Sequence, residues 1–350
     1  MFTVEAFPAA QGDCIWIEYG IPENPKRILI DTGPRGTAKF IESRIKKMPP
    51  DARKFELLIM SHIDDDHIAG ILDFLENKES FVQFEDVWFN GWHHINESPP
   101  DLMGADQGER FSQKILQKKW QWNKAFNKSH ICIETSRNTP IALSGGMKLT
   151  ILSPTLKNLS SLKEKWEDEI IKKGKVPGWG EEEIPADLLG GTINKSKIIN
   201  WAQMDYDPDP SITNGSSIAV LAEFEGKRAL FAADAHYGVL EKAIIELVKP
   251  GNNLKLDLFK ISHHGSKKNS SCKLMKLINC DRFLISSNGY KHQHPHPETI
   301  AKIVCHRDLD KVLYFNYRSE YNKEWDDNRF KSQFKYSTVY NENGFCSISL

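Results

Sequence analysis

The segment from residue 62 to residue 67, HIDDDH, gathers two imidazoles and three carboxylates in six consecutive positions after a short apolar run. Neutral imidazoles and ionised carboxylates are ligands that suit Zn²⁺ or Mn²⁺. A loop after a strand would point His62, Asp64 and Asp66 inward, with His67 beside them. The segment therefore predicts a metal site, and a solvated run of charges is the alternative interpretation.

Three further motifs place a carboxylate or imidazoles at the end of an apolar run. LIDTG presents Asp31, which would either orient a metal-binding histidine or cap a turn. LFAADAH presents Asp234, which would either bridge two cations or cap a helix. LFKISHHGS ends in His263 and His264, and paired histidines at a strand end favour a ligand role over turn capping.

The loop NGYKHQHPHPE carries three histidines just before an expected helix. His292 and His296 are interpreted as surface loop residues, which leaves His294 as the candidate for chemistry. Two weaker clusters, at 93–94 and 207–209, are interpreted as loop features.

Composition sets the broad class of the protein. With 350 residues, 40% hydrophobic and 27% charged, the chain is long enough for one large α/β domain or two modest ones. With a net charge of -1, the protein as a whole does not attract nucleic acids or membranes electrostatically. Binding of a polyanion would need a local patch of positive charge. Scattered cysteines, no signal peptide and no apolar run of membrane-spanning length predict a cytoplasmic protein without a membrane partner.

Apolar periodicity predicts strands and helices in two strand-rich halves. In the first half we expect a meander of strands at 2–7, 14–19 and 27–30, a helix at 37–47, a strand at 55–60 and a helix at 68–76. In the second we expect strands at 216–224, 228–233, 256–261 and 283–286, helices at 238–248 and 297–305, and closing strands at 312–317 and 336–350. This pattern predicts a sheet-on-sheet core covered by helices, in one domain spanning 1–350.

The middle of the chain is less regular and is interpreted as insertions at about 90–137 and 160–212. In these segments and between them we expect a helix at 112–127, a strand at 148–152, a solvated charged helix at 163–169, and a long loop or lid at 172–210.

Taken in order, the motifs resemble the metallo-β-lactamase superfamily, whose diagnostic motif is HxHxDH. They are more similar to its competence-type, ComEC-like branch, which reads GDA, DxG, HxDxDH, Asn with Ser, GDA, HHGS and GHPHP. The matching segments here are GDC at 12–14, DTG at 31–33, HIDDDH at 62–67, NGSS at 214–217, ADA at 233–235, HHGS at 263–266 and HPHP at 294–297. The resemblance implies a four-layer αβ/βα sandwich with metals at one edge of two sheets, interrupted by helical and loop insertions.

The resemblance also implies two divalent cations, most naturally Zn²⁺ with Mn²⁺ as the alternative. His62 and Asp64 would bind the first cation, Asp66 and His67 the second, and Asp234 both.

One of His263 and His264 would complete the second cation site, and the sequence leaves the choice open. Asn214 stands near the position where the wider superfamily has a third-motif histidine. Since Asp64 also replaces a histidine of HxHxDH, the first site would be rich in oxygen, which makes Mn²⁺ or a single-metal state credible.

The implied chemistry is hydrolysis by a hydroxide held between two cations. Asp66 would orient this hydroxide, and His294 would contact the substrate or protonate the leaving group. Ser266, Lys267 and Lys268 would hold a phosphate.

The resemblance favours a phosphodiesterase or nuclease acting on DNA or RNA. One alternative is hydrolysis of a small carboxylic substrate such as a thioester, lactam or peptide, because one fold hosts many chemistries. A drug-degrading β-lactamase fits least, given Asp64 and the lack of a secretion signal. The other alternative is a non-catalytic metal-binding module that contacts a partner through 172–210.

Overall fold

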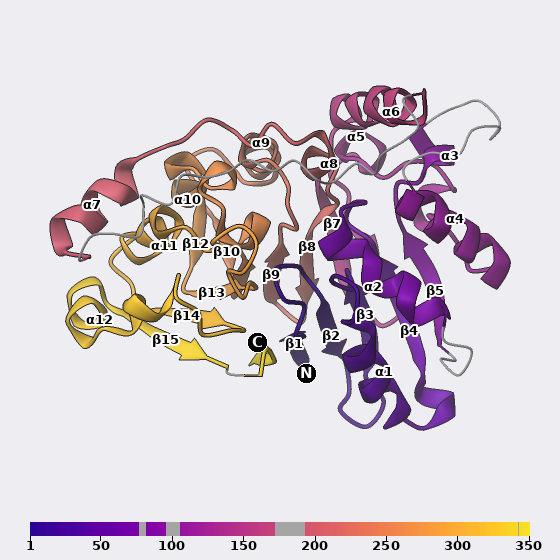
Figure 1. Cartoon of the computed structure of the whole chain (residues 1–350), viewed down its shortest axis with the longest axis horizontal. Coiled ribbons are helices and arrows are strands. Elements are labelled where there is room, and N and C mark those ends of the chain that lie inside the picture. The colour runs from indigo at the N-terminus through magenta and orange to yellow at the C-terminus, as the bar shows by residue number, and fades with distance from the viewer. Residues whose placement is uncertain (77–81, 96–105, 172–192, 342) are drawn as a thin grey trace.

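A computed structural model describes residues 1–76, 82–95, 106–171, 193–341 and 343–350. It shows a mixed α/β fold, in agreement with the sequence at this coarse level. Two large sheets dominate the structure, and the N- and C-terminal strands lie side by side (Figure 1).

The first sheet has six strands. Their order is β16 (Cys346–Ser349), β1 (Phe2–Ala6), β2 (Ile15–Tyr19), β3 (Lys26–Ile30), β4 (Lys54–Ile59) and β5 (Gln83–Trp88). The antiparallel pairs β1–β2 and β2–β3 confirm the predicted meander, and β3, β4 and β5 run parallel. The last strand of the chain, β16, pairs antiparallel with the first.

The second sheet has eight strands. Their order is β15 (Tyr336–Tyr340), β14 (Lys311–Phe315), β13 (Arg282–Ile285), β11 (Leu258–Lys260), β9 (Lys227–Phe231), β8 (Ala219–Phe224), β7 (Lys148–Ser153) and β6 (Ile141–Ala142). The strands from β15 to β9 run parallel, and β8, β7 and β6 continue antiparallel. A separate parallel pair joins β10 (Leu254–Leu256) to β12 (Ile278–Cys280).

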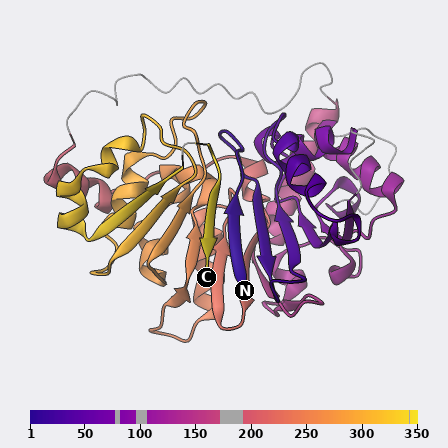
Figure 2. The same cartoon turned by 90° about the horizontal axis from the view of Figure 1, so that it is seen from below.

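The two sheets pack face to face, and one apolar cluster joins Ile17 and Leu57 of the first to Val220 and Phe231 of the second. The outer face of each sheet packs against helices, which flank the strands in Figure 2. Those on the first sheet are α1 (Ala38–Lys46), α2 (Asp65–Glu76) and α4 (Asp106–Lys118). Those on the second are α7 (Lys195–Gln203), α9 (Tyr237–Leu247), α10 (Cys272–Leu277), α11 (Pro297–Val304) and α12 (Asn328–Phe334).

The helix predicted at 112–127 is wrong beyond Lys118, where α4 ends. Lys119 has a φ of 55°, in the left-handed region that stops a helix. The chain then pairs Trp122 with Val87 as a β-bridge, and the Trp122 indole donates a 2.9 Å hydrogen bond to the Phe89 carbonyl. Of residues 119–127, residues 124–126 form the short 3-10 helix η2 (Lys124–Phe126).

Two other predictions for the middle of the chain need correction. The charged helix at 163–169 lies within α6 (Leu156–Ile171), but its Trp166 is only 1% exposed and packs against Trp92, so the helix is not solvated all round. Of the loop predicted at 172–210, residues 172–192 lie outside the described part. Residues 195–203 form α7, which Asn194 caps.

Short helices complete the middle of the chain: α3 (Trp92–Ile95), α5 (Ile133–Ser136) and α8 (Ile212–Gly215). The run predicted as one strand at 256–261 is divided between β10 and β11, and the closing stretch at 336–350 is divided between the two sheets. Within the described residues, every helix is too short or too polar to cross a membrane.

Candidate metal centre

The candidate ligands come from both sheets and meet where parallel strands end. Asp31 follows β3 and His62 lies three residues beyond the end of β4. In the second sheet, Asp234 follows β9, while His263 and His264 follow β11. Because the carboxyl ends of parallel strands share one edge of a sheet, motifs far apart in sequence converge there.

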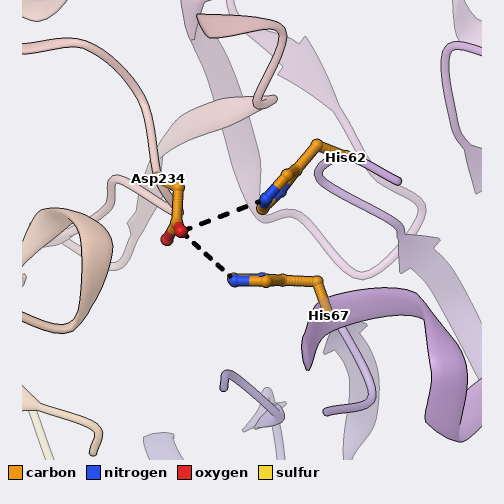
Figure 3. A group of neighbouring side chains, drawn as sticks. All are labelled: His62, His67 and Asp234. Carbon is orange, nitrogen blue, oxygen red and sulfur yellow. Dashed lines mark ion pairs between the residues drawn. The ribbon is translucent and has the colours of Figure 1, made fainter. Parts of the chain in front are cut away.

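The Asp234 carboxylate is the meeting point of four imidazoles. Its Oδ2 lies 4.0 Å from Nε2 of His62, 3.5 Å from Nε2 of His67 and 3.6 Å from Nε2 of His263. Its Oδ1 lies 3.6 Å from Nε2 of His264. Figure 3 shows His62 and His67 directed at this carboxylate from neighbouring elements.

The Nδ1 atoms of the two first-sheet histidines are held by hydrogen bonds. Nδ1 of His67 lies 2.8 Å from Oδ2 of Asp31. The Ser61 hydroxyl donates to the same carboxylate over 2.6 Å, so it accepts from Nδ1 of His62, 2.9 Å away. In the neutral form of both rings the proton therefore lies on Nδ1, and Nε2, which faces Asp234, carries the lone pair.

The two second-sheet histidines are held in the same way. Nδ1 of His263 lies 2.9 Å from Oδ1 of Asn269 and 3.2 Å from Oδ2 of Asp209. Nδ1 of His264 donates to the Ser286 carbonyl over 3.0 Å. Since a carboxylate or carbonyl oxygen only accepts, these contacts again leave Nε2 unprotonated in the neutral rings.

Several inward atoms of this cluster are buried polar atoms that the described residues leave without a hydrogen bond. Nε2 of His62, His67 and His264 and Oδ1 of Asp234 are buried and have no hydrogen-bond partner among the described residues. Each such group costs roughly 1–3 kcal/mol when left unsatisfied. Ligand atoms of His62, His67 and Asp234 lie within 4.8 Å of one another, as do those of Asp66, His67 and His264. The donor set therefore fits divalent metal ions.

The two remaining carboxylates of HIDDDH flank the cluster. Oδ2 of Asp64 lies 3.7 Å from Nε2 of His62 and accepts a 3.1 Å hydrogen bond from the Thr213 hydroxyl. Oδ2 of Asp66 lies 3.7 Å from Nε2 of His264. The loop expected after the strand holds His62 and Asp64 but is wrong for Asp66 and His67, because α2 begins at Asp65 and places these two residues in its first turn. Asp65 is exposed and accepts a hydrogen bond from Gln107 outside the cluster.

Several residues around the cluster have a backbone conformation that is costly for side chains other than glycine. The φ angles are 55° at Asp31, 46° at Ala233, 45° at His263 and 54° at His264. Such strain costs about 1–3 kcal/mol per residue and collects at functional sites. These φ angles turn the chain sharply after each strand, and the turns direct the candidate ligands toward the cluster.

Charge and burial shift the pKa values of the cluster in opposite directions. Burial alone would raise the pKa of Asp234, but His263, His67 and His264 hold it well below its usual range. Burial alone would lower the pKa of His67, but Asp234 and Asp31 raise it well above its usual range. Burial alone would also lower the pKa of His263, but the anions Asp234 and Asp209 raise it to about 9. Removal of protons from these rings would accompany metal binding.

Asn214 and His294 both lie beside His263. Nδ2 of Asn214 donates to Asp209 over 2.7 Å and lies 3.4 Å from Nδ1 of His263. The His294 ring is 5% exposed and its centroid lies 5.1 Å from that of His263. Burial, with further lowering by the neighbouring histidines, holds the pKa of His294 well below its usual range.

Ser266 and Lys267 make local contacts near the cluster. The Ser266 side chain is buried and accepts from the backbone N–H of Lys268 over 3.3 Å. The Lys267 ammonium lies 3.5 Å from Oε1 of Glu298 and 4.4 Å from the ring centre of Tyr206. Lys267 would therefore have to leave Glu298 to reach a phosphate.

Sequence reasoning gave no role to three residues that the structure brings to the cluster. Asp209, interpreted as a loop residue, also accepts a 3.1 Å hydrogen bond from Asn269. Asp13 and Lys260 form a buried ion pair next to His264. The GDC motif was the only signal for Asp13, and no motif spacing singled out Asp209 or Lys260.

Comparison with known proteins gives one partial similarity. No family model matches the chain. A stretch of 162 residues, 44% of the chain, is 22% identical to ComE operon protein 3 of Bacillus subtilis (strain 168). That stretch covers 20% of the Bacillus protein, so the chain spans about a fifth of the length of this relative.

Proposed function

We propose that the protein is a metal-dependent hydrolase of the metallo-β-lactamase type, and that it cleaves phosphodiesters in DNA or RNA. The observation that carries this proposal is the convergence of four imidazole Nε2 atoms on Asp234. Most of these inward atoms lack any other partner among the described residues.

The architecture supports the choice of superfamily. Two sheets share one apolar core and each packs helices on its outer face, which is the arrangement expected of a four-layer αβ/βα sandwich. The cluster lies where parallel strands of both sheets end, as the resemblance implies for the metals. The partial similarity to ComE operon protein 3 favours the competence-type branch.

The distances suggest how two cations would be shared. His62 and Asp64 flank the Oδ2 side of Asp234, whereas Asp66 and His264 flank its Oδ1 side. His67 belongs to ligand groups on both sides.

His263 and His264 both place Nε2 at 3.6 Å from an Asp234 oxygen, so we propose both as ligands, one on each side. The mixture of carboxylates and imidazoles suits Zn²⁺ or Mn²⁺.

Divalent ions held there would lower the pKa of a water molecule and stabilise charge on the attacking and leaving oxygens of a phosphodiester. Asp66 would orient the attacking water by accepting its hydrogen bond. His294 would contact the substrate or donate a proton to the leaving oxygen. Asp31 and Ser61 would keep His67 and His62 in the tautomer that binds metal.

The test compares two neighbouring carboxylates of α2. Metal-free protein is incubated with bis-p-nitrophenyl phosphate, single-stranded DNA and double-stranded DNA, with Mn²⁺ or Zn²⁺ added. We expect metal-dependent cleavage that falls by at least about 10²-fold in Asp66→Ala. Asp65→Ala is the matched control, because Asp65 is exposed outside the cluster, and it should cleave at the wild-type rate.

A metal-loaded protein that leaves all three phosphodiesters intact would contradict the proposal. Hydrolysis of a thioester, lactam or peptide instead would support the small carboxylic substrate. Metal binding without any hydrolysis would support a non-catalytic module.

A further inference from the structure

A lysine is buried beside the candidate metal centre. Lys260, the last residue of β11, is 1% exposed, and its ammonium contacts Oδ2 of Asp13, which is 2% exposed. Lysine is almost never fully buried unless it is paired. The pair joins the second sheet to the loop between β1 and β2 of the first, and the proposed mechanism does not use it.

The second oxygen of Asp13 faces a candidate ligand. Oδ1 of Asp13 lies 3.4 Å from Nδ1 of His264 and has no hydrogen-bond partner among the described residues. Nδ1 of His264 already donates to the Ser286 carbonyl, so the proton of the neutral ring lies between two acceptors. The opposite atom of the ring, Nε2, faces Asp234 and Asp66.

The loop that carries Asp13 is fixed to the second sheet. The Ser286 hydroxyl donates to the Gly12 carbonyl over 2.9 Å, and the Asn288 N–H donates to the Ala10 carbonyl over 2.9 Å. These two hydrogen bonds to loop carbonyls fix the loop next to the second sheet, and they thereby hold Asp13 behind His264. Lys260 lies four residues before His264, so one segment supplies both the ligand and the counter-ion of Asp13.

We infer that Asp13 and Lys260 are positioning residues for His264: the Asp13 carboxylate favours the proton on Nδ1, which leaves Nε2 to bind metal, and Lys260 holds that carboxylate behind the ring by pairing with it. A carboxylate behind a metal-binding histidine fixes its tautomer and makes it a stronger ligand. A buried carboxylate that loses its ion-pair partner is strongly destabilised, so Lys260 is needed to hold Asp13 in this position. This inference rests on the proposed metal centre.

Two measurements test the inference on Asp13→Asn and Lys260→Met. Zn²⁺ affinity is measured by competition with a chromophoric chelator, and we expect a loss of about 10- to 100-fold in each variant. The tautomer of His264 in the metal-free protein is read from the ring ¹⁵N signals of ¹⁵N-histidine-labelled protein, assigned with His264→Gln. We expect the share of the Nδ1-protonated form to fall in both variants.

Lys227→Met is the matched control. Lys227 forms a 2.9 Å ion pair with Asp257, but this pair lies at the start of β9, at the end of the strand opposite Asp234. We expect the metal affinity and the His264 signals of this variant to equal those of the wild type.

Folding failure is covered by a double variant. If Lys260→Met does not fold, Asp13→Asn/Lys260→Met leaves no unpaired buried charge and should still bind Zn²⁺ about 10- to 100-fold more weakly. Folded variants with wild-type affinity and an unchanged tautomer would overturn the inference. A wild type that binds no metal would instead refute the metal centre, and the tautomer measurement would still decide the role of Asp13.

Discussion

Asp31 and His67 are joined by a 2.8 Å hydrogen bond between Oδ2 and Nδ1, although they come from the end of β3 and the first turn of α2. The same carboxylate accepts from the backbone N–H of Ser61 over 2.7 Å and from its hydroxyl over 2.6 Å. Through Ser61 it also fixes His62. One fully buried carboxylate thus orients two candidate ligands.

Asp31→Asn should weaken metal binding by about 10- to 100-fold. The amide of asparagine has only one acceptor oxygen, so it cannot serve His67 and both donors of Ser61 at once. Chelator competition measures the change. Asp73→Asn is the control, because Asp73 lies on the same helix but pairs with Arg35 near the surface, and equal affinities for the two variants would contradict the prediction.

Metal should stabilise the folded protein. A ligand that binds only the native state at a free concentration of 100 times Kd adds about 2.7 kcal/mol to the free energy of unfolding. We therefore expect Zn²⁺ or Mn²⁺ to raise the Tm and EDTA to reverse the rise, measured by scanning calorimetry. Asp234→Asn removes the shared carboxylate and should abolish the shift; a Tm that still rises with metal in this variant would place the metal elsewhere.

Gly12→Ala should disturb Asp66. A Cβ on Gly12 would lie 1.8 Å from the Asp66 carbonyl oxygen, so the start of α2 must move. Overpacking of this kind costs about 1–3 kcal/mol, and we expect a matching fall in the urea midpoint together with weaker metal binding. Gly238→Ala, in α9, meets nothing within 4 Å and should be at least as stable as the wild type.

His306, which belongs to none of the candidate ligand groups among the described residues, should make stability depend on pH. Burial, helped by Arg307, lowers the pKa of His306 to about 4, and its Nε2 donates to the Ile278 carbonyl. Between the ordinary pKa of 6.5 and about 4, the unfolded chain therefore binds the proton more readily than the folded one. The free energy of unfolding should fall as pH drops through this window. Urea titrations of His306→Gln should show a shallower fall; identical slopes would contradict the assignment.

The sequence predicted the parts of the site that follow directly from an apolar run. Asp31, His62, Asp234 and the histidines after β11 all come within a few residues of a strand end, and their convergence follows from parallel strands. Asp209 has no such signal, because its importance depends on contact with His263, distant in sequence.

Long-range pairing also explains the errors in the fold. Residues near Trp122 have a local pattern compatible with a helix, but their bridge to Val87 prevails. The closing stretch at 336–350 was predicted only as strand, and its two strands have different partners: β15 pairs with β14, whereas β16 pairs with β1. Local periodicity predicts that a segment is a strand, but it does not indicate which distant strand that segment will pair with.

The pairing of β16 with β1 has a consequence for how the chain folds. During synthesis the edge of β1 stays open until residues 346–349 have emerged, so the first sheet is completed only after the other strands of both sheets have been made. Contacts of such sequence separation slow folding. An uncovered strand edge is also a template for pairing between molecules, and β1 is therefore where nascent or truncated chains should begin to aggregate.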